Sequence, residues 1–182
     1  LSGRYIDNFL IKRYIKESFW FFFIFQISTG VFMGKYSIVK PAGTGCEAVV
    51  VCCFDFRFGE AIRKHLKESL GLRPGTYDFA SLPGGAKTVI NGDGSAMKSI
   101  DLAVKLHQVN EIVIINHADC GAYGGRTEFD HDHEKEFDFH QSQLRQAKDA
   151  IADKHPDKKV TTLFLRFREL GKKLHIEIVE VH

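Results

Sequence analysis

The sequence predicts an α/β fold in which helices flank a mainly parallel central β-sheet. From residue 46 onward, segments with the pattern of strands alternate with segments that carry apolar residues at the spacing of helices. Two strand segments, 48–53 and 111–116, are almost continuously apolar, which is typical of strands covered on both faces. Strands that alternate with helices usually pair in parallel. The 182 residues suit one domain with a substantial core.

The first strand, at 48–53, leads to a helix that begins near Gly59 and stops at Gly71. Its apolar face consists of Ile62, Leu66 and Leu70. The remaining elements are expected in this order: a strand at 77–82, a helix with Ser95 as its N-cap, a strand at 111–116, a helix at 137–154, and strands at 160–167 and 174–181. Gly171 connects the last two strands, so they can form an antiparallel hairpin at the edge of the sheet.

Composition argues against several classes of protein. Twenty-five basic and twenty-three acidic residues nearly cancel, and no block of Lys and Arg suits a phosphate backbone, so no nucleic-acid partner is expected. Four cysteines are too few for a disulfide scaffold in a chain of this size. Reduced thiols indicate an intracellular protein, and we expect a cytoplasmic location.

Residues 1–32 differ from the rest of the chain. Basic residues precede the apolar run 19–25, and small polar residues follow it, an order that is similar to a signal peptide. The run is much shorter than the roughly 20 residues that span a bilayer, so no membrane partner is expected. Met33 begins a stretch that reads like an ordinary N-terminus. We therefore expect an N-terminal extension or arm over 1–32 and a single α/β domain over 33–182.

Two strand segments end in side chains that can bind a metal ion. Cys53 ends the first, and His117 follows the strand at 111–116, with Cys120 three residues further on. Ligands collect outside the carboxyl ends of parallel strands, and neighbouring strands lie about 5 Å apart. Two thiolates and one imidazole would fill three positions of a tetrahedral zinc site and leave the fourth open, as in a catalytic zinc site. We expect one Zn²⁺ per chain, although each residue taken separately would be better explained as a buried thiol or a loop histidine.

The two motifs together resemble those of the β-class carbonic anhydrases. The family signature C-x-D-x-R matches residues 53–57, H-x-x-C-G matches residues 117–121, and the resemblance extends over about 47–181. It implies that Cys53, His117 and Cys120 bind zinc, and that Asp55 and Arg57 form a catalytic dyad beside the open position. It also implies a lyase that reversibly hydrates carbon dioxide to bicarbonate and a proton, and a homodimer or higher homo-oligomer.

Two departures from the family pattern concern the substrate. The position before Arg57 is usually small in the family but is Phe56 here, and a loop that commonly contains Ala-Gly-Asn reads Ala-Ser-Leu-Pro-Gly-Gly-Ala at 80–86. Some relatives on this scaffold hydrolyse carbon disulfide or carbonyl sulfide, and Phe54, Phe56 and Phe58 would give a pocket apolar enough for either. A second enzyme hypothesis is therefore a hydrolase of such a heterocumulene. A third is a non-catalytic zinc-binding or interaction protein of the same fold.

Several other residues leave alternatives open. Asp119 either supports His117 or is a solvated loop acid. The run 131–134, His-Asp-His-Glu, together with His140, is either a solvated surface, a second metal site or a proton relay. Tyr123, His131 and His133 are candidate relays that the sequence does not rank. Cys52, which precedes a predicted ligand, should point into the core.

Overall fold

The computed structural model describes residues 46–182, so the predicted extension over 1–32 lies outside the described residues. The strands are β1 (Ala48–Cys52), β2 (Tyr77–Ser81), β3 (Glu111–His117), β4 (Lys159–Leu170) and β5 (Lys173–Glu180). The α-helices are α2 (Gly59–Glu68), α3 (Ala86–Ile90), α4 (Ser95–Leu102) and α5 (His133–Lys154). A π-helical turn, η1 (Ala103–His107), and two short 3₁₀ helices, η2 (Gly121–Tyr123) and η3 (Arg126–Phe129), complete the list. None of the helices in this part of the chain has the length and apolar character needed to cross a bilayer.

The five strands form one sheet in the order β2-β1-β3-β4-β5. All neighbouring pairs are parallel except β4 and β5, which pair in antiparallel fashion. Gly171, with φ +64°, lies in the turn between them. The predicted α/β fold, with a mainly parallel sheet and an antiparallel edge hairpin, is therefore confirmed.

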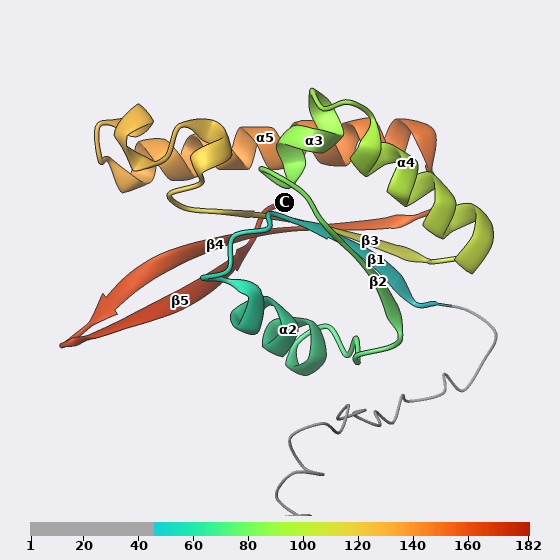
Figure 1. Ribbon diagram of the computed structural model, residues 1–182, viewed down its shortest axis with the longest axis horizontal. Coiled ribbons are helices and arrows are strands. Elements are labelled where there is room, and N and C mark those ends of the chain that lie inside the picture. Colours follow the sequence, from blue (N-terminus) through green and yellow to red (C-terminus); the bar gives the residue numbers. More distant parts are fainter. Residues whose placement is uncertain (1–45) are drawn as a thin grey trace, which may run out of the picture. The chain divides into compact units, whose positions relative to one another are not determined.

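Helices cover both faces of this sheet, with α3, α4 and α5 on one face and α2 on the other (Figure 1). Alternate residues of each central strand point to opposite faces. Val51 and Ile114 belong to the core under α4 and α5, whereas Val50 and Val113 belong to the core over α2. Burying such a side chain contributes about 1.5–3 kcal/mol. This double coverage explains the continuous apolar runs, and it confirms that Cys52, only 1% exposed, is a core residue.

Two helix starts differ from the prediction, and one short helix was not predicted. The helix α5 begins at His133 rather than near Phe137, because the Asp132 carboxylate accepts hydrogen bonds from the N–H groups of Glu134 and Lys135. The predicted N-cap of α4, Ser95, is instead its first residue, and its N–H donates to the Asp93 carboxylate at 2.9 Å. The short α3 was not predicted, since five residues are too few for a helical period.

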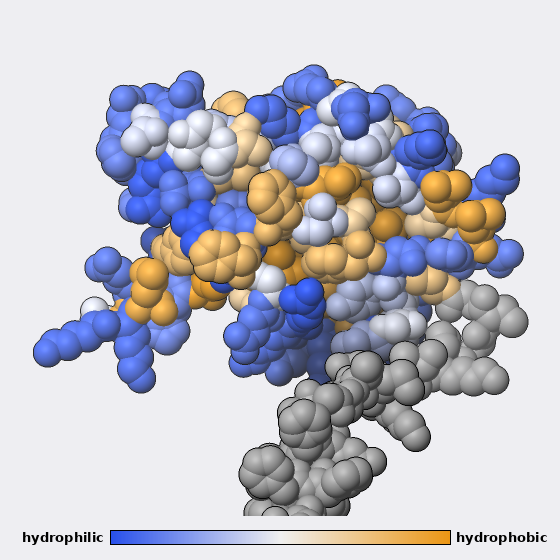
Figure 2. All heavy atoms as spheres, viewed as in Figure 1, coloured by the Kyte–Doolittle hydropathy of each residue, from blue (hydrophilic) through white to orange (hydrophobic). Residues whose placement is uncertain are grey.

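Within residues 46–182, no element covers an apolar surface at the β2 edge of the sheet. Figure 2 shows apolar side chains gathered over this region, where Phe79, Leu82 and Leu102 line a groove of about 410 Å³. Phe79 and Leu102 are both exposed large apolar side chains. The groove contains none of the predicted site residues.

Candidate metal centre

The two predicted strand ends meet at one edge of the sheet. The registers of β1 and β3 place Cys52 beside Ile115, so Cys53 leaves the sheet next to the last residues of β3. His117 ends β3, and Cys120 lies in the loop that follows. The ligand atoms of Cys53, His117 and Cys120 all lie within 4.8 Å of one another. In the described part of the chain, this is the one group of three or more side chains that could hold a metal ion.

His117 has the tautomer and the free nitrogen that a metal ligand needs. Its Nδ1 lies 2.8 Å from the carbonyl oxygen of Ala118, a contact in which Nδ1–H donates and Nε2 keeps its lone pair. Nε2 is buried and has no hydrogen-bond partner within residues 46–182. Leaving a buried polar atom unpaired costs about 1–3 kcal/mol. A ligand on Nε2 would remove that cost.

The two thiols also fit a zinc ion. Their Sγ atoms are 3.8 Å apart, close to the separation of about 3.8 Å that two sulfur ligands have in a tetrahedral site with Zn–S bonds near 2.3 Å. The hydrogen bond with Cys120 lowers the pKa of Cys53 to about 4, although burial opposes the shift. The same contact raises the pKa of Cys120. Two thiolates this close repel each other, so the pair favours a divalent cation between them.

Asp55 and Arg57 form a close ion pair beside the three donors. The Nε and one Nη of Arg57 donate to both oxygens of Asp55 at 2.7–3.1 Å, and the Arg57 N–H also donates to Oδ1. These hydrogen bonds lower the pKa of Asp55. Oδ2 of Asp55 lies 4.0 Å from Nε2 of His117. The carboxylate therefore lies next to the candidate metal position while Arg57 holds it.

Arg57 also binds the loop between His117 and Cys120. One Nη donates to the Asp119 carboxylate at 2.8 Å and the other to the Asp119 carbonyl at 3.0 Å. The sequence left two alternatives for Asp119, support of His117 or a solvated loop acid. Neither describes this side chain, which binds Arg57 instead. Its hydrogen bond with Arg57 lowers its pKa. One guanidinium thus joins the loop after β1 to the loop after β3.

Aromatic rings pack behind this ion pair. Phe58 is buried, and its ring centroid lies 4.5 Å from that of His117 and 4.9 Å from that of Phe167. The Arg57 guanidinium lies 5.6 Å from the centroids of both Phe58 and Phe167, within the range of cation–π attraction. Phe56 is 91% exposed, so the bulky residue before Arg57 does not push it from Asp55.

The Gly-rich loop after β2 forms another wall of the site. The N–H of Gly84 donates to Sγ of Cys53 at 3.5 Å. A Cβ atom on Gly85, whose φ is +50°, would lie 2.3 Å from the carbonyl oxygen of Ile115 and 2.8 Å from the Asn116 side chain. The next N–H, that of Ala86, donates to Asn116 at 2.9 Å. The glycines therefore allow this loop to approach β3 closely.

A small pocket opens beside the donors. It has a volume of about 270 Å³, and its lining includes Cys53, Asp55, Phe54, Phe56 and Phe79. Its lining combines three aromatic rings with polar side chains such as Arg63 and Ser81, so the pocket suits a small molecule with both apolar and polar contacts. Phe58, by contrast, packs under His117 and does not line it.

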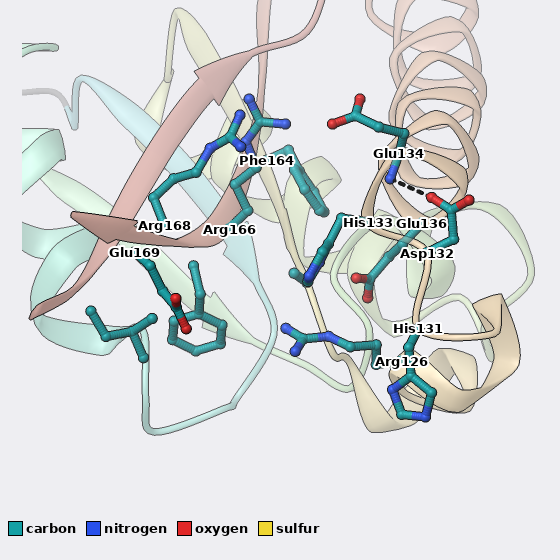
Figure 3. A pocket seen from close by; sticks show the side chains of 13 residues that line it. Arg126, His131, Asp132, His133, Glu134, Glu136, Phe164, Arg166, Arg168 and Glu169 are labelled. Atoms are coloured by element: carbon teal, nitrogen blue, oxygen red, sulfur yellow. Dashed lines mark hydrogen bonds between the residues drawn. The ribbon is translucent and has the colours of Figure 1, made fainter. Parts of the chain in front are cut away.

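The candidate relay residues lie in different places. The Tyr123 hydroxyl accepts a hydrogen bond from Asn116 at 3.3 Å, and burial raises the pKa of Tyr123 to about 12. His131 and His133 line a separate pocket of about 650 Å³ that contains none of the three donors (Figure 3). The ligand atoms of the run 131–134 do not converge as those of the three donors do. His140 is buried against Asn116, and burial lowers its pKa to about 3.

Comparisons with known proteins agree with this geometry. The sequence model of a family described as "Putative carbonic anhydrase" matches residues 44–179. The chain belongs to this family. An uncharacterized protein of Rickettsia conorii is 33% identical over 127 residues, which cover 65% of this chain and 67% of that protein. An uncharacterized protein of Rickettsia bellii is 30% identical over 126 residues, which cover 65% of this chain and 76% of that protein.

Solved structures of carbonic anhydrases share the fold. The β-carbonic anhydrase isoform I of Trichomonas vaginalis superposes with a TM-score of 0.53 at 13% identity, covering 97% of this chain and 98% of that chain. The β-carbonic anhydrase CafA of Aspergillus fumigatus gives a TM-score of 0.51 at 19% identity, covering 94% and 91%. These likenesses confirm a β-carbonic-anhydrase-like fold.

Sequence reasoning missed two residues in the surroundings of the site. Asn116 binds the Gly-rich loop, Tyr123 and His140, and its signal was a polar residue at the end of a buried apolar run. Glu136, which accepts a hydrogen bond from the Asp119 N–H, was missed because the helix was expected to start after it. Asp132 followed by Glu134 and Glu136 was the available signal for the earlier start.

The Arg57 contact gives a prediction for the titration of Asp55. A carboxyl group whose pKa is lowered in the folded state stabilises the fold at pH values above its usual pKa. This stabilisation is lost as the pH falls through the lowered pKa. Replacing Arg57 by Ala should therefore raise the pKa of Asp55 toward the usual range, as followed by the ¹³C shift of the carboxyl in an NMR titration. Asp157, which pairs with Lys158, is the internal control and should not change. An unchanged Asp55 would contradict this assignment.

Proposed function

We propose that the protein is a zinc lyase that reversibly hydrates carbon dioxide to bicarbonate and a proton. The observation that carries the proposal is the group of one half-buried thiol, one buried thiol and one buried, unpaired imidazole nitrogen next to the Asp55–Arg57 ion pair in the described part of the chain. Membership of a carbonic anhydrase family and the fold of the two β-carbonic anhydrases support it.

Cys53, His117 and Cys120 would hold one Zn²⁺ per chain. A zinc ion bound there would lower the pKa of a water molecule in its fourth position. That position would stay free for water, because Arg57 holds the neighbouring carboxylate of Asp55 by several hydrogen bonds. The described geometry thus favours three protein ligands over four.

Asp55 and Arg57 would position the reacting water. The Asp55 carboxylate is ionised because Arg57 lowers its pKa, so it can accept a hydrogen bond from the water and orient a lone pair toward the substrate carbon. Arg57 would fix the direction of that carboxylate. If Arg57 were withdrawn, Asp55 could move the short distance to the metal and close the site.

The aromatic pocket beside Asp55 would bind the substrate. Its volume of about 270 Å³ accommodates carbon dioxide and also carbon disulfide or carbonyl sulfide. The exposed ring of Phe56 is the observation that favours the second candidate, a hydrolase of these heterocumulenes. Assays of both reactions on one preparation, with hydrogen sulfide release as the second readout, separate the two functions. A zinc-loaded protein inactive in both would leave the non-catalytic zinc-binding protein as the remaining hypothesis.

The other expectations from the sequence remain proposals. They are the single catalytic domain over 33–182, the cytoplasmic location and the homodimer or higher homo-oligomer. The uncovered apolar surface at β2 supports the last of these, because such surfaces often mark protein interfaces.

The proposed ligands predict the zinc content of cysteine variants. The purified full chain should carry about one zinc ion, and Cys53→Ser or Cys120→Ser should lose most of it, because two remaining donors do not complete a stable site. Cys46→Ser is the matched control, since Cys46 donates only to backbone carbonyls. Metal content is measured by inductively coupled plasma mass spectrometry after dialysis. Full zinc occupancy in Cys120→Ser would remove that residue from the ligand set.

The proposed dyad predicts how arginine variants behave. Arg57→Ala should keep zinc yet lose at least about tenfold in carbon dioxide hydration by stopped flow, because Asp55 is no longer held. Arg145→Ala is the control, since Arg145 donates to the backbone carbonyl of His182 and does not line the substrate pocket, so this variant should stay close to wild type. Near wild-type turnover in Arg57→Ala would exclude the dyad from the mechanism.

A further inference from the structure

A buried carboxylate lies behind the dyad and has no role in the function proposed above. Glu136, on the first turn of α5, is only 1% exposed. Figure 3 shows its carboxylate directed away from the helix and into the pocket that Arg126 and His133 also line. Within residues 46–182 it forms no salt bridge. Burying a carboxyl group without a hydrogen-bond partner is costly, so a specific contact must compensate.

That contact is a hydrogen bond with the metal-site loop. Oε1 of Glu136 accepts the N–H of Asp119 at 2.6 Å. The start of α5 adds a favourable field, because the N-terminus of a helix stabilises negative charge. Glu136 therefore belongs to the first turn of α5 and binds the loop between His117 and Cys120 through the Asp119 N–H.

Asp119 needs such support because its backbone has an uncommon conformation. Its φ is +56°, in the left-handed region that residues other than glycine seldom adopt. In this conformation its carbonyl and its carboxylate both accept hydrogen bonds from Arg57. Its other carboxylate oxygen accepts the N–H of Arg126 at 3.1 Å. The orientation of Asp119 therefore decides where the Arg57 guanidinium lies.

These contacts form a continuous chain of hydrogen bonds from α5 to the dyad. Glu136 binds the Asp119 N–H, Asp119 binds Arg57, and Arg57 binds Asp55. We propose that Glu136 is a positioning residue, which holds Asp119 in its left-handed conformation and thereby keeps Arg57 on Asp55. The expected loss of turnover rests on the function proposed above. The expected change in the position of the Arg57 side chain does not depend on that function.

Substitutions of Glu136 separate its hydrogen bond from its charge. Glu136→Gln keeps an oxygen that can accept from Asp119, whereas Glu136→Leu removes the acceptor. Glu134→Leu is the matched control, because it removes an acid from the same helical turn, and Glu134 does not bind Asp119. All variants are prepared as the zinc-loaded full chain, and their zinc content and unfolding midpoint are measured first.

The direct readout is NMR of two N–H groups, the Asp119 amide and the Arg57 side-chain Nε–H. In Glu136→Leu the amide signal should move upfield and the Nε–H signal should broaden through faster exchange with water. Hydration should fall at least about tenfold, as is typical when support of a metal site is removed. Glu136→Gln should restore both signals and most of the activity, and Glu134→Leu should resemble wild type.

Two results would overturn the proposal. One is a Glu136→Leu protein with wild-type Nε–H exchange, and the other is a Glu136→Gln protein as impaired as Glu136→Leu. If Glu136→Leu does not fold, the test uses the Gln variant and the wild-type protein. In wild type, an Asp119 amide hydrogen that exchanges with solvent as fast as an unprotected amide would also exclude the hydrogen bond with Glu136. If the wild type has no hydration activity, the proposed function fails while the NMR measurements still test the role of Glu136.

Discussion

The parallel pairing of β1 with β3 is the constraint on which the candidate site depends. Cys52 lies opposite Ile115 in this register, so Cys53 and the residues after Ile115 leave the sheet side by side. The apolar cores on both faces of the sheet fix this register. A shift by one residue would turn the side chains of either strand from one core to the other. The register therefore places Cys53 beside the end of β3, and the loop after β3 brings Cys120 to 3.8 Å from it.

Arg57 provides the second constraint, since it joins the loops that follow these two strands. Its guanidinium lies between the carboxylates of Asp55 and Asp119 and within cation–π distance of Phe58. Without a cation between them, the two carboxylates would repel each other and leave the thiols in a strongly negative environment. One side chain thus balances the charge of the site and holds Asp55 away from the metal position.

The sequence predicted what depends on periodicity and on the ends of strands. The sheet, its edge hairpin and the buried Cys52 follow from apolar patterns, and the convergence of Cys53, His117 and Cys120 follows from the rule that ligands collect at the carboxyl ends of strands. The roles of Asp119 and Glu136 could not be predicted, because they depend on a left-handed backbone and on the exact start of a helix. Motif spacing defines the donors, whereas tertiary contacts define what supports them.

The most direct test of this account is X-ray absorption spectroscopy at the zinc edge on the zinc-loaded full chain. The account predicts about two sulfur neighbours near 2.3 Å and two lighter nitrogen or oxygen neighbours near 2.0–2.1 Å. The second light neighbour should persist in Asp55→Asn, because under the proposed function it would be a water molecule and not the carboxylate. A coordination shell without sulfur, or with a single sulfur, would contradict the central claim that Cys53 and Cys120 bind the same ion.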